Sequence, residues 1–354
     1  MNRDVPVVTV GVRAVDVGYK NVKYSLGRKL VGGVNTIATG LLPAVAPRLA
    51  TKNMMKDPDI DACIVNVAGS DYIVGPSAVD HTSVSEQQAF DLEYSATDRY
   101  HALMLGALNY MGDEAGAGHE FVIERLVLGL PLNTYHQNVQ ALTKRAVGEH
   151  VIRRAGSDQH RRVTVMAAHV MVQPHGALLD FGVAHPTLLK DDRSTVVIDP
   201  GGGTLDWFVT RGTTPNWTRC GAHPKAMLHC AYAIADLINP RWRTQYEIVD
   251  AIDTALRTSA DDFQIGPRRF RMSDFRSAVD AVLEESVKHM IEKTGPLDSI
   301  SRIVLIGGGA PVLREYLLRD DPDLAAIIHT DSAPVFSNVR GFQIAGEVLE
   351  RGRA

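Results

Sequence analysis

The chain has 354 residues, of which 45% are hydrophobic and 22% are charged, and its formal net charge at pH 7 is −4. This composition is typical of a soluble globular protein that is long enough for two domains. It excludes nucleic-acid binding through an overall basic charge, and no apolar stretch is long enough for a membrane span. The N-terminus has no signal-peptide pattern, so we expect a cytoplasmic protein without direct contact to membranes or nucleic acid.

The first predicted element is a β-hairpin near the N-terminus. A β-rich run over residues 7–15 leads into Asp16 and Gly18, and the chain returns through Asn21 and Lys23. Asn21 and Lys23 are two residues apart on the returning strand, so their side chains face the same side. The turn therefore presents a carboxylate, an amide and an ammonium group to one candidate ligand.

Residues 32–60 lose any clear period because glycines and prolines interrupt them repeatedly. A short hairpin is predicted around Gly69, and we interpret residues 32–95 as an insertion in the first domain. Regular elements follow: a helix over 100–110, a strand over 121–130, a helix with apolar side chains at Val139, Leu142, Ala146 and Val147, and strands within 161–172. Residues 173–180 then begin a helix or a loop.

A second hairpin of the same kind begins near residue 195. A β-branched run over 195–198 ends at Asp199, and an apolar run over 205–209 follows the turn, which consists of Pro200, Gly201, Gly202, Gly203 and Thr204. Glycine amides can approach an anion closely, and an adjacent aspartate suits a hydrated Mg²⁺. Taken alone, this stretch fits an ordinary glycine-rich hairpin equally well.

The remaining elements continue the alternation of strands and helices. Amphipathic helices are predicted over 223–239, 277–293 and 338–350, and a strand over 303–306 precedes a third glycine turn, which contains Gly307, Gly308 and Gly309. This alternation predicts an α/β fold with mostly parallel central sheets. Two strand–aspartate–glycine hairpins and a late glycine turn together form a much more specific pattern than any one of them.

The three cysteines, Cys63, Cys220 and Cys230, are too few and too dispersed for a disulfide scaffold. His223 and His229 lie between the last two, which leaves a zinc site conceivable. No closely spaced pair of cysteines supports such a site, so buried thiols are the favoured interpretation.

The two hairpins and the third turn resemble the two phosphate hairpins and the adenosine turn of the actin/Hsp70/sugar-kinase ATPase superfamily. Within it, the chain looks most like the bacterial actin-like plasmid-segregation proteins of the ParM/StbA type, since its length and the segments 129–132 and 338–341 also resemble theirs. The resemblance implies two RNase H-like α/β domains that flank a nucleotide cleft. Domain I would comprise residues 1–194 and about 335–354, with the small inserted subdomain at 32–95, and domain II residues 195–334.

The resemblance also implies a role for each site residue. Asp16 and Asp199 would hold Mg²⁺, largely through water, and Asp199 would count among the catalytic residues. ATP or GTP would bind to Asp16, Gly18, Asn21, Lys23, Gly201, Gly202, Gly203, Thr204, Gly307, Gly308 and Gly309. Related segregation proteins carry a glutamate or glutamine just after a proline in the segment that matches 172–176. Here that position is His175, and Gln173 competes with it by analogy with eukaryotic actins. If His175 positions the attacking water, hydrolysis should depend on the titration of this histidine.

The resemblance implies an ATPase that polymerises into nucleotide-dependent filaments and segregates plasmid DNA. The filament would contact the DNA through an adaptor protein bound to a centromere-like site. Three alternatives stay open. A small-molecule kinase of the superfamily needs a general-base aspartate in a substrate pocket, and a chaperone of the Hsp70 kind needs a further domain. A cell-shape actin usually has a membrane-binding segment. The sequence does not determine filament architecture, nucleotide preference, the adaptor or the DNA site.

Overall fold

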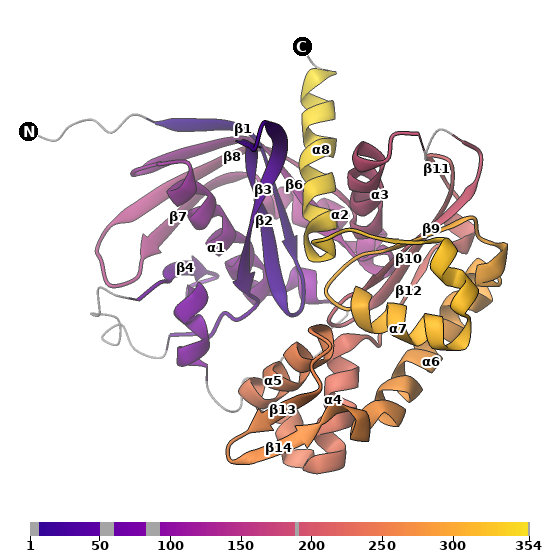
Figure 1. Cartoon of the computed structure of the whole chain (residues 1–354). Coiled ribbons are helices and arrows are strands. Elements are labelled where there is room, and N and C mark those ends of the chain that lie inside the picture. The colour runs from indigo at the N-terminus through magenta and orange to yellow at the C-terminus, as the bar shows by residue number, and fades with distance from the viewer. Residues whose placement is uncertain (1–6, 50–59, 83–92, 188–190, 353–354) are drawn as a thin grey trace, which may run out of the picture.

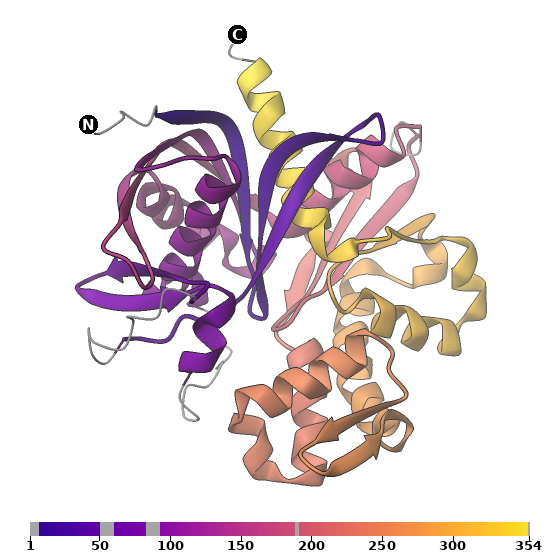
Figure 2. The same ribbon diagram turned by 60° about the vertical axis from the view of Figure 1, so that its left-hand side comes forward.

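The computed structural model describes residues 7–49, 60–82, 93–187 and 191–352. Two large β-sheets dominate this part of the chain, each covered by helices (Figures 1 and 2). None of the described helices is long and apolar enough to cross a membrane. The N-terminal strand and the C-terminal helix lie in the same half of the molecule in both views.

The first sheet has eight strands in the order β3-β2-β1-β6-β8-β7-β4-β5. The strands are β1 (Val8–Val17), β2 (Asn21–Val31), β3 (Val34–Pro43), β4 (Cys63–Val67), β5 (Ser70–Val74), β6 (Glu120–Leu130), β7 (Gly148–Arg154) and β8 (His160–Val172). β6 runs parallel to β1 and β8 at the centre, and the outer strands pair antiparallel. The centre of the sheet is therefore parallel, but the expected mostly parallel sheet is wrong: among the described residues, two strand pairs are parallel and five are antiparallel, because hairpins extend both edges.

Helices cover both faces of the first sheet because its central strands alternate their apolar side chains between two cores. On one face, Val15 packs in a core with α1 (Asp98–Glu114) and α2 (Leu132–Ala146). On the other face, Val12 and Ala14 pack in a core with Phe342 of the last helix, α8 (Ser337–Arg351). The C-terminal helix therefore lies against strands from the beginning of the chain (Figure 1).

The second sheet contains β11-β10-β9-β15-β16, and β12 pairs with β10 beside this path. The strands are β9 (Ser194–Pro200), β10 (Leu205–Arg211), β11 (Thr214–Pro215), β12 (Gly221–His223), β15 (Arg302–Leu305) and β16 (Ile328–Thr330). Its core includes residues of α3 (Gln173–Ala184), α6 (Arg276–Thr294) and α7 (Ala310–Asp320). A further lobe combines α4 (Met227–Ile238) and α5 (Tyr246–Arg257) with the hairpin of β13 (Asp262–Ile265) and β14 (Arg268–Arg271) (Figure 1).

The structure confirms both predicted hairpins, since β1 pairs with β2 and β9 pairs with β10 in antiparallel register. The sequence predicted no regular element in 32–60, and this is wrong. β3 extends from Val34 to Pro43 because Gly32 and Gly33 adopt positive φ and close a tight hairpin. Within the described residues, 32–95 adds β3, β4 and β5 to the eight-stranded sheet and forms no separate one.

Two helix boundaries also differ from the prediction. The helix expected from residue 223 begins at Met227, because His223 pairs with Leu205 as part of β12. Val147 was expected on the apolar face of α2, but it lies just beyond the helix end and is exposed. At His223 strand pairing overrides the helical period of the apolar residues. At Val147 the helix has already ended, so the period no longer applies.

α3 and α8 cross at two glycines that permit an unusually close approach. A Cβ on Gly341 would lie 1.7 Å from the carbonyl oxygen of Gly176, and one on Gly176 would lie 2.5 Å from Phe342 Cε1. Beside this crossing, Arg340 donates hydrogen bonds to Asp180, at 2.6 Å from Nη2 to Oδ2. Because α3 packs on the second sheet and α8 on the first, this contact joins the two halves of the molecule.

We therefore expect Gly341→Ala to destabilise the protein by about 1–3 kcal/mol or more, because the added methyl group has no room between the helices. Gly11→Ala is the matched control, since a Cβ there would meet only the end of the Glu124 side chain, at 3.6 Å. Urea unfolding of both variants measures the difference. Equal stability of the two variants would contradict the packing argument.

Candidate functional site

A cleft between the two sheets collects nearly all the residues that the sequence singles out. It holds about 970 Å³ of empty space, including its open mouth. The predicted residues that line it are Asp16, Gly18, Asn21, Lys23, Gln173, Asp199, Gly201, Gly202, Gly203, Thr204, Gly307, Gly308 and Gly309. One predicted residue, His175, does not line it.

Asp16 is buried at the end of β1 and is held from two sides. Lys23 Nζ, on the returning strand, lies 3.2 Å from Asp16 Oδ2. Gln173 Nε2, at the start of α3, donates to Asp16 Oδ1 at 2.6 Å. The predicted juxtaposition of Asp16 and Lys23 is therefore present, and Gln173 joins them from another element.

Asp199 ends β9 in the second sheet and is also buried. Asn338 Nδ2, at the start of α8, donates to Asp199 Oδ2 at 2.7 Å. Asn338 thus makes a direct link between the C-terminal helix and the second hairpin. It was noted in the sequence only as part of the segment 338–341, without a role of its own.

Asp206 is a third buried carboxyl group in this cleft, and the sequence analysis assigned it no role. The Thr204 hydroxyl donates to Asp206 Oδ2 at 2.6 Å, and the backbone amide of Leu132 donates to Oδ1 at 3.3 Å. The sequence contains a pattern that could have identified Asp206. Thr204 and Asp206 are two apart around the start of a strand, as Asn21 and Lys23 are in the first hairpin.

Glycines allow the three turns to approach one another closely. A Cβ on Gly202 would lie 3.4 Å from Tyr19 Cβ, so the second hairpin reaches the turn of the first. A Cβ on Gly307 would lie 2.1 Å from Asp199 Oδ1, and Gly307 has a φ of 75°. Gly309 donates its amide hydrogen to Pro200 O at 3.2 Å. Glycine at 307 is therefore required both by space and by backbone conformation.

Burial of carboxyl groups gives the cleft an unusual electrostatic state. Burial is the main reason that the pKa of Asp199 is raised to about 6; within this net value the charge of Lys23 lowers the pKa and the charge of Asp16 raises it. Burial raises the pKa of Asp206 to about 7, although the hydrogen bond from Thr204 lowers it. Carboxyl groups in such surroundings favour a bound proton or a bound cation.

Ion pairs also cross from the first hairpin to α5. Lys20 Nζ lies 2.9 Å from Asp253 Oδ2, and it pairs with Asp250 as well. Arg257 Nη2 lies 2.8 Å from Asp253 Oδ2 and lines the same cleft. Sequence reasoning missed this group, because charged residues on a helix are usually a solvated face and nothing local distinguishes these.

The two candidates for positioning a water differ in their surroundings. Gln173 is buried and faces the cleft beside Asp16. His175 stacks on the ring of Phe208, with 5.4 Å between ring centroids, and burial lowers its pKa. The geometry therefore favours Gln173 for a function inside the cleft.

The cysteines are buried free thiols, as the favoured interpretation expected. Cys220 Sγ donates to Asn216 O at 3.1 Å and lies in the core of the second sheet, whereas Cys230 lies in the core of the α4–α5 lobe. His223 has a different set of neighbours, Glu285 and His289.

Comparison with known proteins agrees with the resemblance drawn from the sequence. Residues 14–176 match the family model of the N-terminal domain of actin-like proteins. Among curated protein sequences, no match to the chain is found.

Three solved structures illustrate the similarity of fold. The apo psk41 ParM protein is 19% identical, with a TM-score of 0.66 over 96% of this chain and 98% of that one. A 15-stranded ParM filament from Clostridium botulinum is 16% identical, with a TM-score of 0.70 over 95% and 99%. The archaeal actin homolog Ta0583 in complex with ADP is 16% identical, with a TM-score of 0.68 over 95% and 99%. The predicted actin-like α/β fold is confirmed, and the chain shares this fold with ParM proteins.

The raised carboxyl pKa values predict how stability depends on pH. In the unfolded chain aspartate ionises near about pH 4, so the folded chain holds these protons more tightly. The free energy of unfolding of the protein without nucleotide should therefore fall as the pH rises from about 4 to about 7. Asp206→Asn should reduce this fall, because it removes the carboxyl group whose pKa is raised to about 7.

Thermal unfolding at pH 5 and pH 8, without metal and nucleotide, measures the effect. The exposed Asp298→Asn serves as the control variant. Asp206→Asn should show a smaller difference in Tm between the two pH values than wild type, and Asp298→Asn should match wild type. A difference as large as that of wild type in Asp206→Asn would disprove the assignment.

Proposed function

Starting from an actin-like chain whose residues 14–176 match the actin-like N-terminal domain, we propose an ATPase that assembles into nucleotide-dependent filaments. The observation that carries this proposal is the convergence of both aspartate hairpins and the third glycine turn on one cleft. In this proposal the filaments segregate plasmid DNA through a DNA-binding adaptor on a centromere-like site.

The residues of the cleft fit a nucleoside triphosphate with Mg²⁺. Asp16, Asp199 and Asp206 bring carboxyl groups into a buried space where Lys23 is close to Asp16. Gly307 leaves room next to Asp199 that any side chain would fill. Excess buried carboxylate beside open backbone turns is suited to a hydrated divalent cation and phosphate oxygens.

Within this site each residue receives a defined task. Asp16 and Asp199 hold the hydrated cation, and bound Mg²⁺ supplies positive charge against the phosphates. Lys23 and the amides of 201–203 bind phosphate oxygens, together with Gly18, Asn21 and the Thr204 hydroxyl. The turn of 307–309 accommodates the flat adenine base. The same contacts are compatible with GTP.

We assign the orientation of the attacking water to Gln173 in place of His175. The Gln173 amide nitrogen donates to Asp16, so its carbonyl oxygen is left to accept a hydrogen bond from water. This is the positioning role that a glutamine fills in phosphoryl transfer to water. Asp16 fixes the side-chain orientation that the role requires.

Filament formation follows from the same cleft in this account. Because residues of both sheets line it, a bound nucleotide contacts both halves and favours one closed arrangement. A closed arrangement that presents complementary head and tail surfaces gives open helical polymers, since heterologous contacts need not close. The fold similarity to a ParM filament supports this reading.

Phosphate release distinguishes the two candidates for the water-positioning residue. Gln173→Ala should lower the rate of ATP hydrolysis by about 100-fold, the order expected for loss of one positioning group, while His175→Ala should stay within a few-fold of wild type. Both variants should still bind nucleotide, which is checked by equilibrium binding. The reverse pattern, with His175→Ala inactive, would restore the histidine hypothesis.

High-speed pelleting with light scattering tests the filament. Wild-type protein should pellet with ATP and Mg²⁺, and Asp199→Ala should not, because it lacks a carboxylate of the cation site. The exposed Asp298→Ala is the matched control and should pellet like wild type. Soluble wild-type protein under every nucleotide, together with phosphate transfer to a small acceptor, would support the kinase alternative instead.

A further inference from the structure

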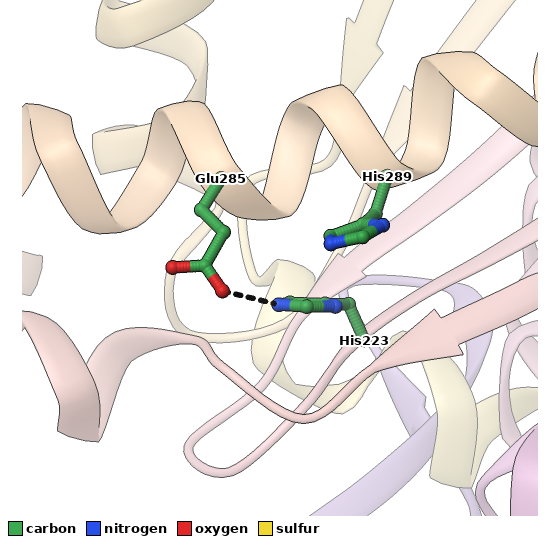
Figure 3. Close-up of side chains that lie close together, drawn as sticks. All are labelled: His223, Glu285 and His289. Atoms are coloured by element: carbon green, nitrogen blue, oxygen red, sulfur yellow. Dashed lines mark ion pairs between the residues drawn. The ribbon is translucent and has the colours of Figure 1, made fainter.

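A second cluster of metal-ligand side chains lies outside the nucleotide cleft. His223, Glu285 and His289 bring one possible ligand atom each to within 4.8 Å of one another (Figure 3). Glu285 and His289 are four residues apart on α6, so they share one helix face, and His223 ends β12 opposite them. None of the three has a task in the proposed nucleotide site.

The two histidine rings are arranged side by side next to the carboxylate. They stack with 4.4 Å between ring centroids and 20° between ring planes. Figure 3 shows a nitrogen of each ring on the side where Glu285 lies. His223 Nε2 lies 3.6 Å from Glu285 Oε1, is buried, and makes no hydrogen bond within the described part of the chain.

Each side chain is in a suitable state to act as a ligand. His223 Nε2 faces Glu285 and is not taken by a hydrogen bond within the described residues, so this nitrogen is available to a metal. His289 Nδ1 lies 3.4 Å from Glu292 Oε2, which leaves Nε2 for a metal. A carboxylate on the far nitrogen of a ligating histidine is the usual outer support of such sites.

We propose that His223, Glu285 and His289 form a binding site for Zn²⁺. Two imidazoles and one carboxylate are a known three-ligand set for zinc, with water in an open fourth position. Ligand atoms of one tetrahedral zinc are roughly 3.4 Å apart, given bonds of about 2.0–2.1 Å. The most widely separated ligand atoms must therefore approach each other by up to about 1.4 Å, which requires the exposed side chains of Glu285 and His289 to move and Glu285 to leave its partner Lys225.

Lys225 competes with the metal in the absence of zinc. Its Nζ lies 2.6 Å from Glu285 Oε2 and 2.8 Å from Oε1, so the ammonium group occupies the carboxylate. A bound cation has to displace this exposed ion pair. Removal of the Lys225 charge should consequently increase the affinity for zinc, which adventitious binding to surface histidines would not predict.

The position of the site gives it a structural consequence. His223 pairs with Leu205 in β10, between Thr204 and Asp206 of the nucleotide cleft. The chain then continues into α4, whose Met227 and Leu228 amides donate to the carbonyl oxygens of Gly201 and Gly202. Zinc would therefore tie α6 to the strand and the turn that support the second hairpin, so bound zinc should stabilise this half of the molecule.

Zinc titration of the tag-free, metal-free full chain against a chromophoric zinc indicator tests the proposal. We expect one saturable site per chain, with affinity reduced at least tenfold in Glu285→Gln and in His289→Ala. Both residues are exposed, so these variants should fold. Glu284→Gln, a neighbouring exposed glutamate on the same helix, should bind like wild type, and Lys225→Ala should bind more tightly.

Thermal unfolding provides the second readout. Zinc should raise the Tm of wild type and of Glu284→Gln, but not that of His289→Ala. The proposal is overturned if no saturable one-to-one binding occurs. It is also overturned if Glu285→Gln and His289→Ala bind zinc as wild type does, which would place the metal elsewhere.

Discussion

Buried negative charge at the meeting point of two sheets is the constraint on which the rest of this structure depends. Asp16 ends a strand of the first sheet and Asp199 ends a strand of the second, and both are buried. Each is held by an amide from a distant element, Gln173 for Asp16 and Asn338 for Asp199. Buried carboxylates are costly unless a positive charge or a proton compensates them, and Lys23 provides such a charge at 3.2 Å from Asp16. The pKa of Asp199 is raised because burial disfavours its charged form.

The surrounding fold can be understood as the means of bringing these groups together. The C-terminal helix packs on the first sheet and also sends Asn338 to Asp199 in the second. Its close crossing with α3 depends on Gly176 and Gly341, and α3 in turn carries Gln173 to Asp16. The same two helices thus join the halves of the molecule and orient both carboxylates. A change in the angle between the halves must therefore change the cleft. In the function proposed above, this coupling is the physical route from the nucleotide state to filament assembly.

The sequence predicted the parts of the site whose signal is local. Both hairpins and the third glycine turn were identified from strand, aspartate and glycine patterns, and they lie together in the structure. Residues that act through distant contacts gave no such signal: Asp253 and Arg257 look like an ordinary charged helix face, and their cleft position depends on how α5 packs. β3 was missed because glycines and prolines suggested irregular structure, although Gly32 and Gly33 form the turn before the strand and Pro43 ends it. The choice between Gln173 and His175 needed the direction of α3, which the sequence of two positions so close together does not reveal.

In the proposed function, Asp16 and Asp199 bind a nucleotide through a shared divalent cation. Calorimetric titration of the chain with a non-hydrolysable ATP analogue, with Mg²⁺ or with a chelator, tests this claim most directly. We predict one nucleotide per chain, bound at least tenfold more tightly with Mg²⁺, and loss of this gain in Asp16→Asn and Asp199→Asn. Nucleotide binding that is equally tight with the chelator, and unchanged in both variants, would contradict the account.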